Sequence, residues 1–146
     1  MTSQLSDSTP IVLPNLHDGN LLGLISVDEQ CILLVSDVLG SMHRITLHAG
    51  ESLRAENFLQ GNIVFDVSVQ TGAEVTETDV LFALSMDEAA ASQHRRFLDE
   101  LLGRIGNGRL HLFQLSSSYG CTLTSLCGDV ASQVADRDTL LRELGL

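Results

Sequence analysis

Two neighbouring residues near the start of the chain carry side chains that are common in catalysis. His17 and Asp18 stand together in the stretch LHDGN, shortly after the last proline. Imidazole and carboxylate groups can both move a proton or bind a metal ion, so a metal-dependent hydrolase could use this doublet. Such an enzyme would need a further histidine brought close by folding. A small hydrolase or metal-binding enzyme that uses His17 and Asp18 with a second histidine is therefore one functional hypothesis.

The same stretch also has the pattern of a turn. Asp18 is expected to accept backbone N–H groups in an Asx turn, and Gly19 to take the unusual backbone angles of that turn. Asn20 would then open the first strand. We favour this structural interpretation, in which HDG starts a sheet.

The three cysteines give little support for a metal site. Cys121 and Cys127 lie on one expected strand, where six residues span about 20 Å and exclude a disulfide or a shared metal ion unless the strand folds back. There is no Cys-x-x-Cys pair, so a zinc site would need long-range assembly from Cys31, His43, His48 or His111. The sequence favours buried, unreactive thiols and predicts neither a metal nor a cofactor.

The remaining motifs do not indicate an enzyme. His43 and His48 are five residues apart on an expected strand and face opposite ways, and His94 is expected at the boundary of a helix. There is no Gly-x-Ser-x-Gly elbow, no His-Glu-x-x-His helix and no phosphate loop, because GRIGNG lacks the lysine. With five phenylalanines, one tyrosine and no tryptophan, platforms for stacking bases or sugars are scarce.

The charge of the chain excludes several kinds of partner. Eight arginines, no lysine and nineteen acidic residues give a net charge of −11. Residues 1–85 hold eleven acidic residues and two arginines and carry −9, whereas residues 86–146 carry −2. Cations are needed to displace counterions from phosphates, so nucleic acid and anionic membranes are not expected as partners. A basic protein partner would be attracted, although such acidity also serves solubility.

Length and composition predict one soluble domain. A chain of 146 residues with 44% hydrophobic residues can form a packed core. The apolar runs are far shorter than the roughly 20 residues that span a bilayer. The first ten residues lack the features of a signal peptide, and an odd number of cysteines fits a reducing compartment, so a cytoplasmic location is expected. Residues 1–14, which contain both prolines, are expected to be an extended lead-in to a domain over residues 15–146.

The strands that would hold these side chains begin at Asn20. NLLGLISV and CILLVSD are rich in branched residues and are separated by DEQ, which predicts a hairpin. MHRITLH alternates, so His43, Ile45 and Leu47 are expected on one face. The stretch ESLRAENF fits either a helical turn or an irregular strand.

Two later stretches are also expected to be strands. In GNIVFDVSVQTG, alternation predicts one buried and one wet face, and the buried face would hold Ile63, Phe65, Val67 and Val69. The stretch VLFALS is apolar on both faces and is expected to be a central strand. RLHLFQLS and CTLTSLC are expected to form a second hairpin around SSYG.

Helical spacing is clearest between residues 85 and 105. Ser85 and Glu88 form a capping-box pattern, and a run of residues from Ala90 to Ile105 recurs at helical spacing until Gly106. A short helix from about Asp136, with Leu140, Leu141 and Leu144 as its apolar stripe, closes the chain. The sequence thus predicts an α+β fold, with one long helix packed on an antiparallel sheet of meander and hairpins and a short C-terminal helix.

One resemblance can be added to these patterns. The run LPNLHDGNLLGL, followed by a hairpin and by HRITLHAGESLRAENFLQGNIVFDV, resembles small acidic bacterial proteins that carry a His-Asp turn before a meander. Some similar proteins are thought to act as immunity partners of secreted toxins. The resemblance covers about residues 12–70 and implies a cytoplasmic binding protein without a cofactor.

Two classes of function follow from the sequence. The first is a non-enzymatic binding protein that acts through a protein–protein interface and presents turn carboxylates to a basic partner. Its candidate binding residues are Asp28, Glu29, Glu74, Glu77 and Asp79, although such residues are often only solvated turns. The second class is the hydrolase that would use His17 and Asp18. A homodimer through the sheet or helix face is compatible with both classes.

Overall fold

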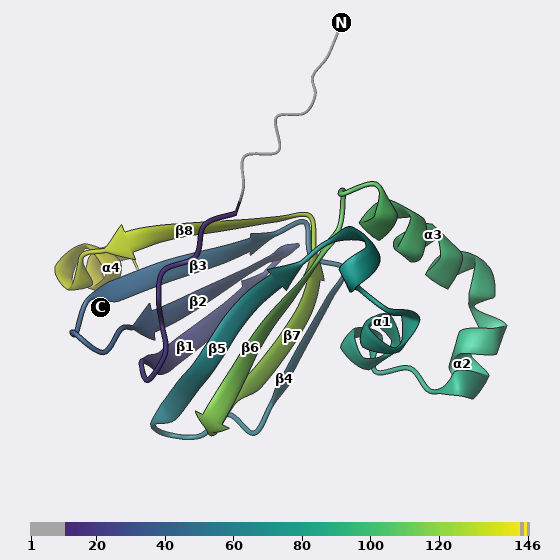
Figure 1. Cartoon of the computed structure of the whole chain (residues 1–146). Coiled ribbons are helices and arrows are strands. Elements are labelled where there is room, and N and C mark those ends of the chain that lie inside the picture. Colours follow the sequence, from purple (N-terminus) through teal and green to yellow (C-terminus); the bar gives the residue numbers. More distant parts are fainter. Residues whose placement is uncertain (1–10, 144, 146) are drawn as a thin grey trace, which may run out of the picture.

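The computed structural model describes residues 11–143 and 145, which form an α+β fold with eight antiparallel strands (Figure 1). The fold class agrees with the sequence prediction. The strands are β1 (Asn20–Val27), β2 (Gln30–Ser36), β3 (Met42–His48), β4 (Ser52–Glu56), β5 (Asn62–Gln70), β6 (His111–Tyr119), β7 (Thr122–Cys127) and β8 (Asp129–Ala135). The helices are the short 3-10 helix η1 (Gly72–Glu74), α1 (Glu77–Leu84), α2 (Glu88–Gln93), α3 (Arg95–Gly106) and α4 (Arg137–Glu143).

The sheet folds over on itself at one weak junction. Its strand order is β4-β7-β6-β5-β1-β2-β3-β8. β1 and β5 pair only at their first residues, Asn20 with Ile63 and Leu21 with Asn62. Beyond this junction the two groups of four strands separate, and they enclose the core between them (Figure 1).

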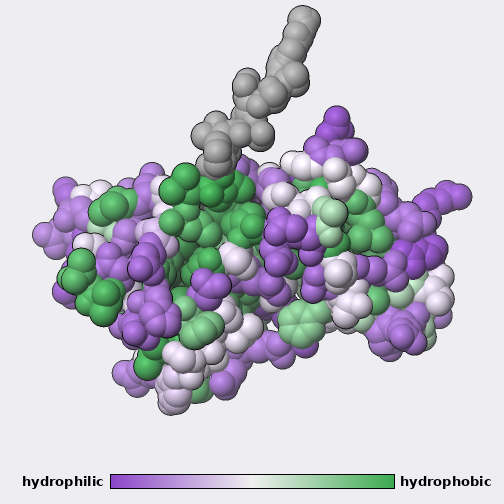
Figure 2. Space-filling view, in the orientation of Figure 1, coloured by the Kyte–Doolittle hydropathy of each residue, from purple (hydrophilic) through white to green (hydrophobic). Residues whose placement is uncertain are grey.

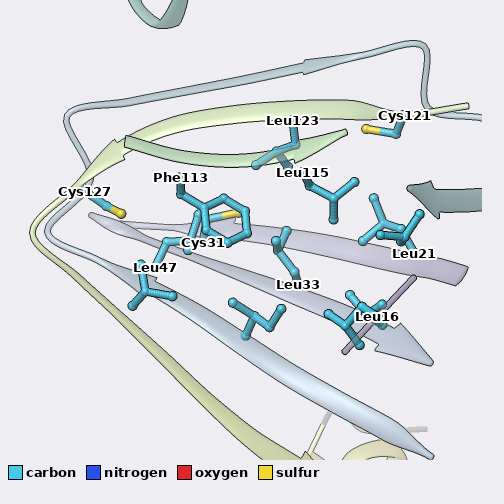
Figure 3. Packing of buried hydrophobic residues seen from close by; sticks show 14 residues of the cluster. Leu16, Leu21, Cys31, Leu33, Leu47, Phe113, Leu115, Cys121, Leu123 and Cys127 are labelled. Atoms are coloured by element: carbon cyan, nitrogen blue, oxygen red, sulfur yellow. The ribbon is translucent and has the colours of Figure 1, made fainter. Parts of the chain in front are cut away.

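The main hydrophobic core lies on the inner face of the folded sheet (Figure 3). β2 and β3 contribute Leu33 and Ile45, and β6 and β7 contribute Phe113 and Leu123, all of them fully buried. Inner-facing residues of both halves therefore pack together, as in a sheet-on-sheet core.

A second core joins the helices to the outer face of β6 and β7. Leu112 and Leu126 point away from the first core and contact buried residues of α1 and α3, among them Val80, Leu98 and Leu101. Both faces of β7 are thus covered, and every residue of this strand except Thr122 is buried.

The first described residues also pack on the sheet. Ile11 and Leu13 lie partly buried against the main core, whereas Val12 is exposed. Figure 2 shows hydrophobic surface gathered next to the start of the described chain, on a face that is otherwise largely hydrophilic. Of the lead-in expected over residues 1–14, residues 1–10 lie outside the described part.

Several sequence predictions are confirmed by the strands. β1 and β2 form a hairpin across the turn at residues 28 and 29, and β6 and β7 form the second hairpin. In β3, His43, Ile45 and Leu47 are buried on one face as expected. The undecided stretch ESLRAENF contains the edge strand β4.

The predicted faces of β5 are wrong in its first half. Val64 is fully buried, whereas Ile63 and Phe65 are exposed by 37% and 55%. The pairing of β5 with β6 shifts register between Ile63 and Val64 and again between Val64 and Asp66. The first irregularity places an extra residue in β6, and the second places an extra residue, Phe65, in β5. The alternation of β5 therefore changes at Phe65, so Val67 packs on the core as predicted while Phe65 does not.

The stretch VLFALS is helical, which contradicts the prediction of a central strand. Thr76 caps α1 through a capping box with Asp79, in which the Thr76 side chain accepts from the Asp79 N–H and the Asp79 carboxylate accepts from the Thr76 N–H. Val80 and Ala83, three residues apart, face the second core. The apolar run is thus the buried side of a capped helix.

The helical region expected after residue 85 is present and is divided. Ser85 ends α1 with a left-handed backbone (φ 56°), and Asp87 caps α2 by accepting from the Ala90 N–H. His94 takes a non-helical conformation between α2 and α3 and is exposed.

At the end of the chain, β8 adds a strand that the sequence did not predict. It is followed by α4, in which Leu140 is buried as expected. Leu144, the last residue of the expected stripe, lies outside the described part. No helix among the described residues is long and apolar enough to span a lipid bilayer.

Candidate functional site

The HDG stretch forms the turn that leads into the sheet. The Asp18 N–H donates to the Val64 carbonyl at 2.9 Å, and the Val64 N–H donates to the Gly19 carbonyl at 2.9 Å. β1 then begins at Asn20. The prediction that HDG starts the sheet is confirmed.

The roles of the individual turn residues differ from the prediction. Asp18, and not Gly19, takes the left-handed backbone, with φ 64°. The Asx contact is made by Asn15, whose side-chain oxygen accepts from the His17 N–H at 3.2 Å. Gly19 is needed instead because the turn passes very close to the end of β2. A Cβ at this position would lie 2.2 Å from the Ser36 carbonyl oxygen.

The His17 side chain is used in holding this turn to β5. Its Nδ1 atom lies 2.8 Å from the Phe65 carbonyl, so Nδ1 carries the hydrogen and donates it. The imidazole meets the Phe65 ring edge-on at 5.5 Å. Nε2 lies 3.6 Å from the Asp18 carboxylate, and both side chains are more than half exposed. This open arrangement resembles a surface contact more than a catalytic cleft.

The structure does not assemble a metal centre around these residues. Within residues 11–143 and 145, no group of three histidine, cysteine, aspartate or glutamate side chains is placed to hold a metal ion. His43, one of the expected zinc candidates, instead contacts Asp37. His17 and Asp18 thus lie next to each other, but no second histidine of the described chain forms a metal-binding group with them.

The five candidate binding carboxylates occupy two separate parts of the fold. Asp28 and Glu29 form the exposed turn between β1 and β2, and Asp28 takes a left-handed backbone with φ 54°. Glu74, Glu77 and Asp79 lie in η1 and at the start of α1. No single local surface is formed by the set as a whole.

Two of the helical carboxylates are already engaged within the chain. Glu77 accepts from Arg95 at 2.6 Å, and this hydrogen bond lowers the pKa of Glu77 below its usual range. Asp79 is used in the capping box of α1. No arginine or histidine of the described chain forms an ion pair with Asp28, Glu29 or Glu74, and of these three Asp28 and Glu29 lie together beside a hollow.

Asp28 and Glu29 stand at the rim of an open hollow at one end of the sheet. Three turns meet there, because the Gly50 N–H donates to the Glu29 carbonyl and the Gly128 N–H donates to the His48 carbonyl, both at 2.8 Å. The hollow is lined by acidic, polar and apolar residues, among them Asp28, Glu29, Glu51, Ser26, Gln30, Ser52, Cys31, Leu47 and Leu53.

The third acidic residue at the rim has a partner. Arg104 of α3 donates to Glu51 at 2.6 Å, and both side chains are about one third exposed. The negative charge available at the rim therefore comes from Asp28 and Glu29. A hollow lined by unpaired carboxylates and by some apolar surface can take a side chain that has an aliphatic stem and a cationic head.

A second histidine–aspartate contact was missed in the sequence. His43 Nε2 lies 2.9 Å from the Asp37 carboxylate, which also accepts from the N–H groups of Leu39 and Ser41 at 3.0 and 2.9 Å. The contact with His43 lowers the pKa of Asp37. Both residues flank the turn between β2 and β3, so an aspartate that opens a loop before a histidine on the next strand was the available signal.

The cysteines are buried and unreactive, as the sequence predicted. Cys31, Cys121 and Cys127 are free thiols in the main core (Figure 3). Burial raises the pKa of Cys31 to about 11 and that of Cys127 to about 12, and it also raises the pKa of Cys121. A thiol with a raised pKa is protonated at neutral pH and is a poor nucleophile.

Comparisons of the chain with protein-family models, with curated proteins and with solved structures give no match.

Proposed function

We propose that this protein is a small non-enzymatic binding protein that recognises a basic segment of a protein partner through Asp28 and Glu29. The observation that carries this proposal is the hollow at the β1–β2 turn, where no arginine or histidine of the described chain pairs with these two carboxylates and the half-buried Leu53 is part of the lining. An arginine or lysine of the partner would place its charged head between the carboxylates and its stem against Leu53.

The charge of the whole chain supports the same kind of partner. A net charge of −11, concentrated in residues 1–85, attracts a basic protein over a longer range than the hollow itself. An immunity-like role, in which the basic partner is a secreted toxin, is one form of this function and follows from the sequence resemblance alone.

The alternative of a hydrolase at His17 and Asp18 has less support. Nδ1 of His17 is used in the contact with Phe65, and the side chains of the doublet are exposed outside any hollow described above. Asp18 has the left-handed backbone of the turn, so a structural role is sufficient to explain an aspartate at this position.

The experiment is an affinity capture from the lysate of the source cell at low and high salt, with bound proteins identified by mass spectrometry. The captured protein is then purified and titrated against wild type and against an Asp28→Asn/Glu29→Gln double variant. Each lost charge-assisted hydrogen bond is worth about 1.5–3 kcal/mol, so we expect at least about tenfold weaker binding.

A matched control separates the hollow from net charge. Glu88→Gln/Glu100→Gln removes the same amount of charge from the exposed surface of α2 and α3 and should leave the affinity nearly unchanged. Equal weakening by both double variants would overturn the assignment to the hollow. A bait that captures nothing at low salt would overturn recognition of a basic partner.

A further inference from the structure

One edge of the sheet is left without the usual protection. β8 pairs with β3 on one side and is the last strand of the sheet on the other. Edge strands in soluble proteins are commonly blocked by charges, prolines or bulges, because their free N–H and C=O groups can pair with another strand. Between Val130 and Ala135 there is no charge, no proline and no glycine, and the pairing with β3 runs through seven residues without a shift.

The opposite edge of the sheet shows the contrast. β4 carries Arg54 and Glu56, which form an ion pair at 3.3 Å. The guanidinium of Arg54 also donates to the Phe82 carbonyl at 2.9 Å and lies over the Phe82 ring, so it connects β4 to α1. The edge at β4 is thus charged and joined to α1 by a side chain, whereas residues 130–135 of β8 carry no charge.

Helix α4 follows β8 but turns away from its free edge. Glu143 of α4 accepts from Arg44 at 2.8 Å, and Arg44 lies on the face of β3 opposite to His43 and Ile45. α4 is therefore held over the outer face of β3 and β8 (Figure 1). Among the described residues, no strand pairs with the free side of β8.

The side chains of β8 are arranged almost symmetrically about its middle. Val130, Ser132 and Val134 pair with Leu47, Ile45 and His43, so all three lie on the inner face. Val130 is only 5% exposed, whereas Val134 is 74% exposed. A second strand placed beside β8 would cover Val134.

We infer that β8 pairs antiparallel with β8 of a second copy of this chain, about a two-fold axis at Ser132. In this register Val130 lies opposite Val134 of the second copy and Val134 opposite Val130, with the two Ser132 residues between them. On the outer face, Ala131 lies opposite Gln133. Asp129 lies opposite Ala135, so no like charges face each other.

Neighbouring registers are less favourable. With the axis at Gln133, Val130 lies opposite the charged residue Asp136 of the second copy. An axis at Ala131 sets Val134 against Gly128 and leaves it without a packing partner. Only the register centred on Ser132 sets both valines against valines, and this self-complementarity favours a second copy over an unrelated strand.

The first test is cross-linking of the otherwise wild-type chain by Ser132→Cys under mild oxidation. Directly opposite residues of an antiparallel pair have Cα atoms about 4.5–5.5 Å apart, which suits a disulfide. The native cysteines are buried, so they do not compete. We expect most of the variant to run as a covalent dimer on a non-reducing gel.

Gln133→Cys is the matched control for the register. With the axis at Ser132, the two introduced cysteines of this control lie on a diagonal, with their Cα atoms about 7–8 Å apart. At this distance a disulfide does not form without backbone movement. Efficient cross-linking through Gln133→Cys, or none through Ser132→Cys, would overturn the proposed register.

The second test measures association in solution by analytical ultracentrifugation. Val134→Lys introduces a charge at an exposed position, so the fold of a single copy should tolerate it, and we expect at least a tenfold weaker dimer. Ala55→Lys, on the opposite edge at β4, should leave the dimer unchanged. A wild-type chain that stays monomeric at all concentrations, or a dimer that survives Val134→Lys, would overturn the inference.

The Asp28→Asn/Glu29→Gln variant should still dimerise, because this inference does not depend on the proposed function.

Discussion

Asn62 is the residue on which the junction of the sheet depends most directly. Its buried side-chain amide donates to the carbonyls of Leu21 and Leu59 at 3.3 and 2.6 Å. Its side-chain oxygen accepts from the N–H groups of Leu59 and Cys121 at 2.8 and 2.9 Å. One side chain thus connects β1, the loop before β5 and the start of β7, and its four contacts satisfy both the donors and the acceptor of the amide.

We expect Asn62→Asp to destabilise the fold by about 2–4 kcal/mol at pH 7, measured by denaturant unfolding. The substitution replaces the amide N–H donors by an oxygen that faces two carbonyl oxygens in a buried position. Asn57→Asp is the control, since Asn57 is exposed and makes one long contact of 3.5 Å to the Gly120 carbonyl. Equal effects of the two substitutions would contradict the role given to Asn62.

His111 makes the stability of the fold depend on pH near neutrality. Its Nδ1 atom is buried without a hydrogen-bond partner in the described structure, and burial lowers the pKa of His111 below its usual value, with Asp129 opposing the shift. The folded chain therefore resists protonation here, while the unfolded chain takes up a proton as the pH falls below about 6.5. The stabilisation is complete above about pH 6.5 and is lost as the pH falls towards the folded pKa.

We expect His111→Phe to flatten the decrease in the free energy of unfolding between pH 7 and pH 5. An aromatic ring is kept at this half-buried position, and the titratable group is removed. Asp37 and Glu77 have lowered pKa values, so their contributions are lost only at more acidic pH, below the ordinary range of carboxyl groups. His94→Gln, which removes an exposed histidine, is the matched control. An unchanged slope in His111→Phe would contradict this assignment.

At the scale of elements, local patterns predict a strand correctly where its pairing is regular. β3 pairs without a shift on both sides, and its alternation placed His43, Ile45 and Leu47 on the buried face. The pairing of β5 with β6 has two irregularities, one of which is an extra residue at Phe65, so Phe65 was assigned to the wrong face. Periodicity describes one strand alone and carries no information about such shifts.

The helix α1 and the strand β8 show two further limits of local patterns. VLFALS is short and apolar, and such runs fit a strand and a buried helix equally well; the capping box of Thr76 and Asp79 was the signal that decides. β8 is rich in small residues and exists because it pairs with β3, more than eighty residues earlier in the chain. That pairing is a long-range contact, which local propensity does not predict.

Gly19 offers a test of how closely the first turn packs on the end of β2. A Cβ at this position would meet the Ser36 carbonyl oxygen at 2.2 Å and the Leu16 carbonyl oxygen at 3.0 Å, so backbone would have to move. We expect Gly19→Ala to destabilise the fold by about 1–3 kcal/mol. Gly103→Ala is the control within α3, where nothing lies within 4 Å of the added Cβ, and it should stabilise by about 0.5–1 kcal/mol. Thermal unfolding that moves both variants in the same direction would contradict the prediction.

At the scale of the whole molecule, the sequence predicted the kind of surface better than the position of the site. The net charge and the acidic turns were evident from composition, and Asp28 and Glu29 were among the five candidates. Which candidates were free depended on contacts between distant residues, such as that of Arg95 with Glu77. The hollow itself arises because the connections β1–β2, β3–β4 and β7–β8 meet at one end of the sheet.

The excess of negative charge makes a prediction for the whole chain. Four arginines, Arg44, Arg54, Arg95 and Arg104, form ion pairs with side chains that are partly exposed, and such pairs are worth about 0–1 kcal/mol each. The eleven uncompensated charges repel one another in the compact state and less in the unfolded chain. Salt weakens both effects, because the screening length falls from about 30 Å at 0.01 M to about 10 Å at 0.1 M.

We therefore expect the melting temperature to rise by about 2–4 °C as sodium chloride is raised from about 10 to about 300 mM, which corresponds to roughly 1 kcal/mol. Calorimetry at low protein concentration keeps association from contributing, and potassium chloride in place of sodium chloride should give the same rise. Sulfate is unsuitable, because it stabilises folded proteins through exclusion from their surface. A melting temperature that falls with salt would show that the ion pairs of the four arginines outweigh the repulsion of the remaining charge.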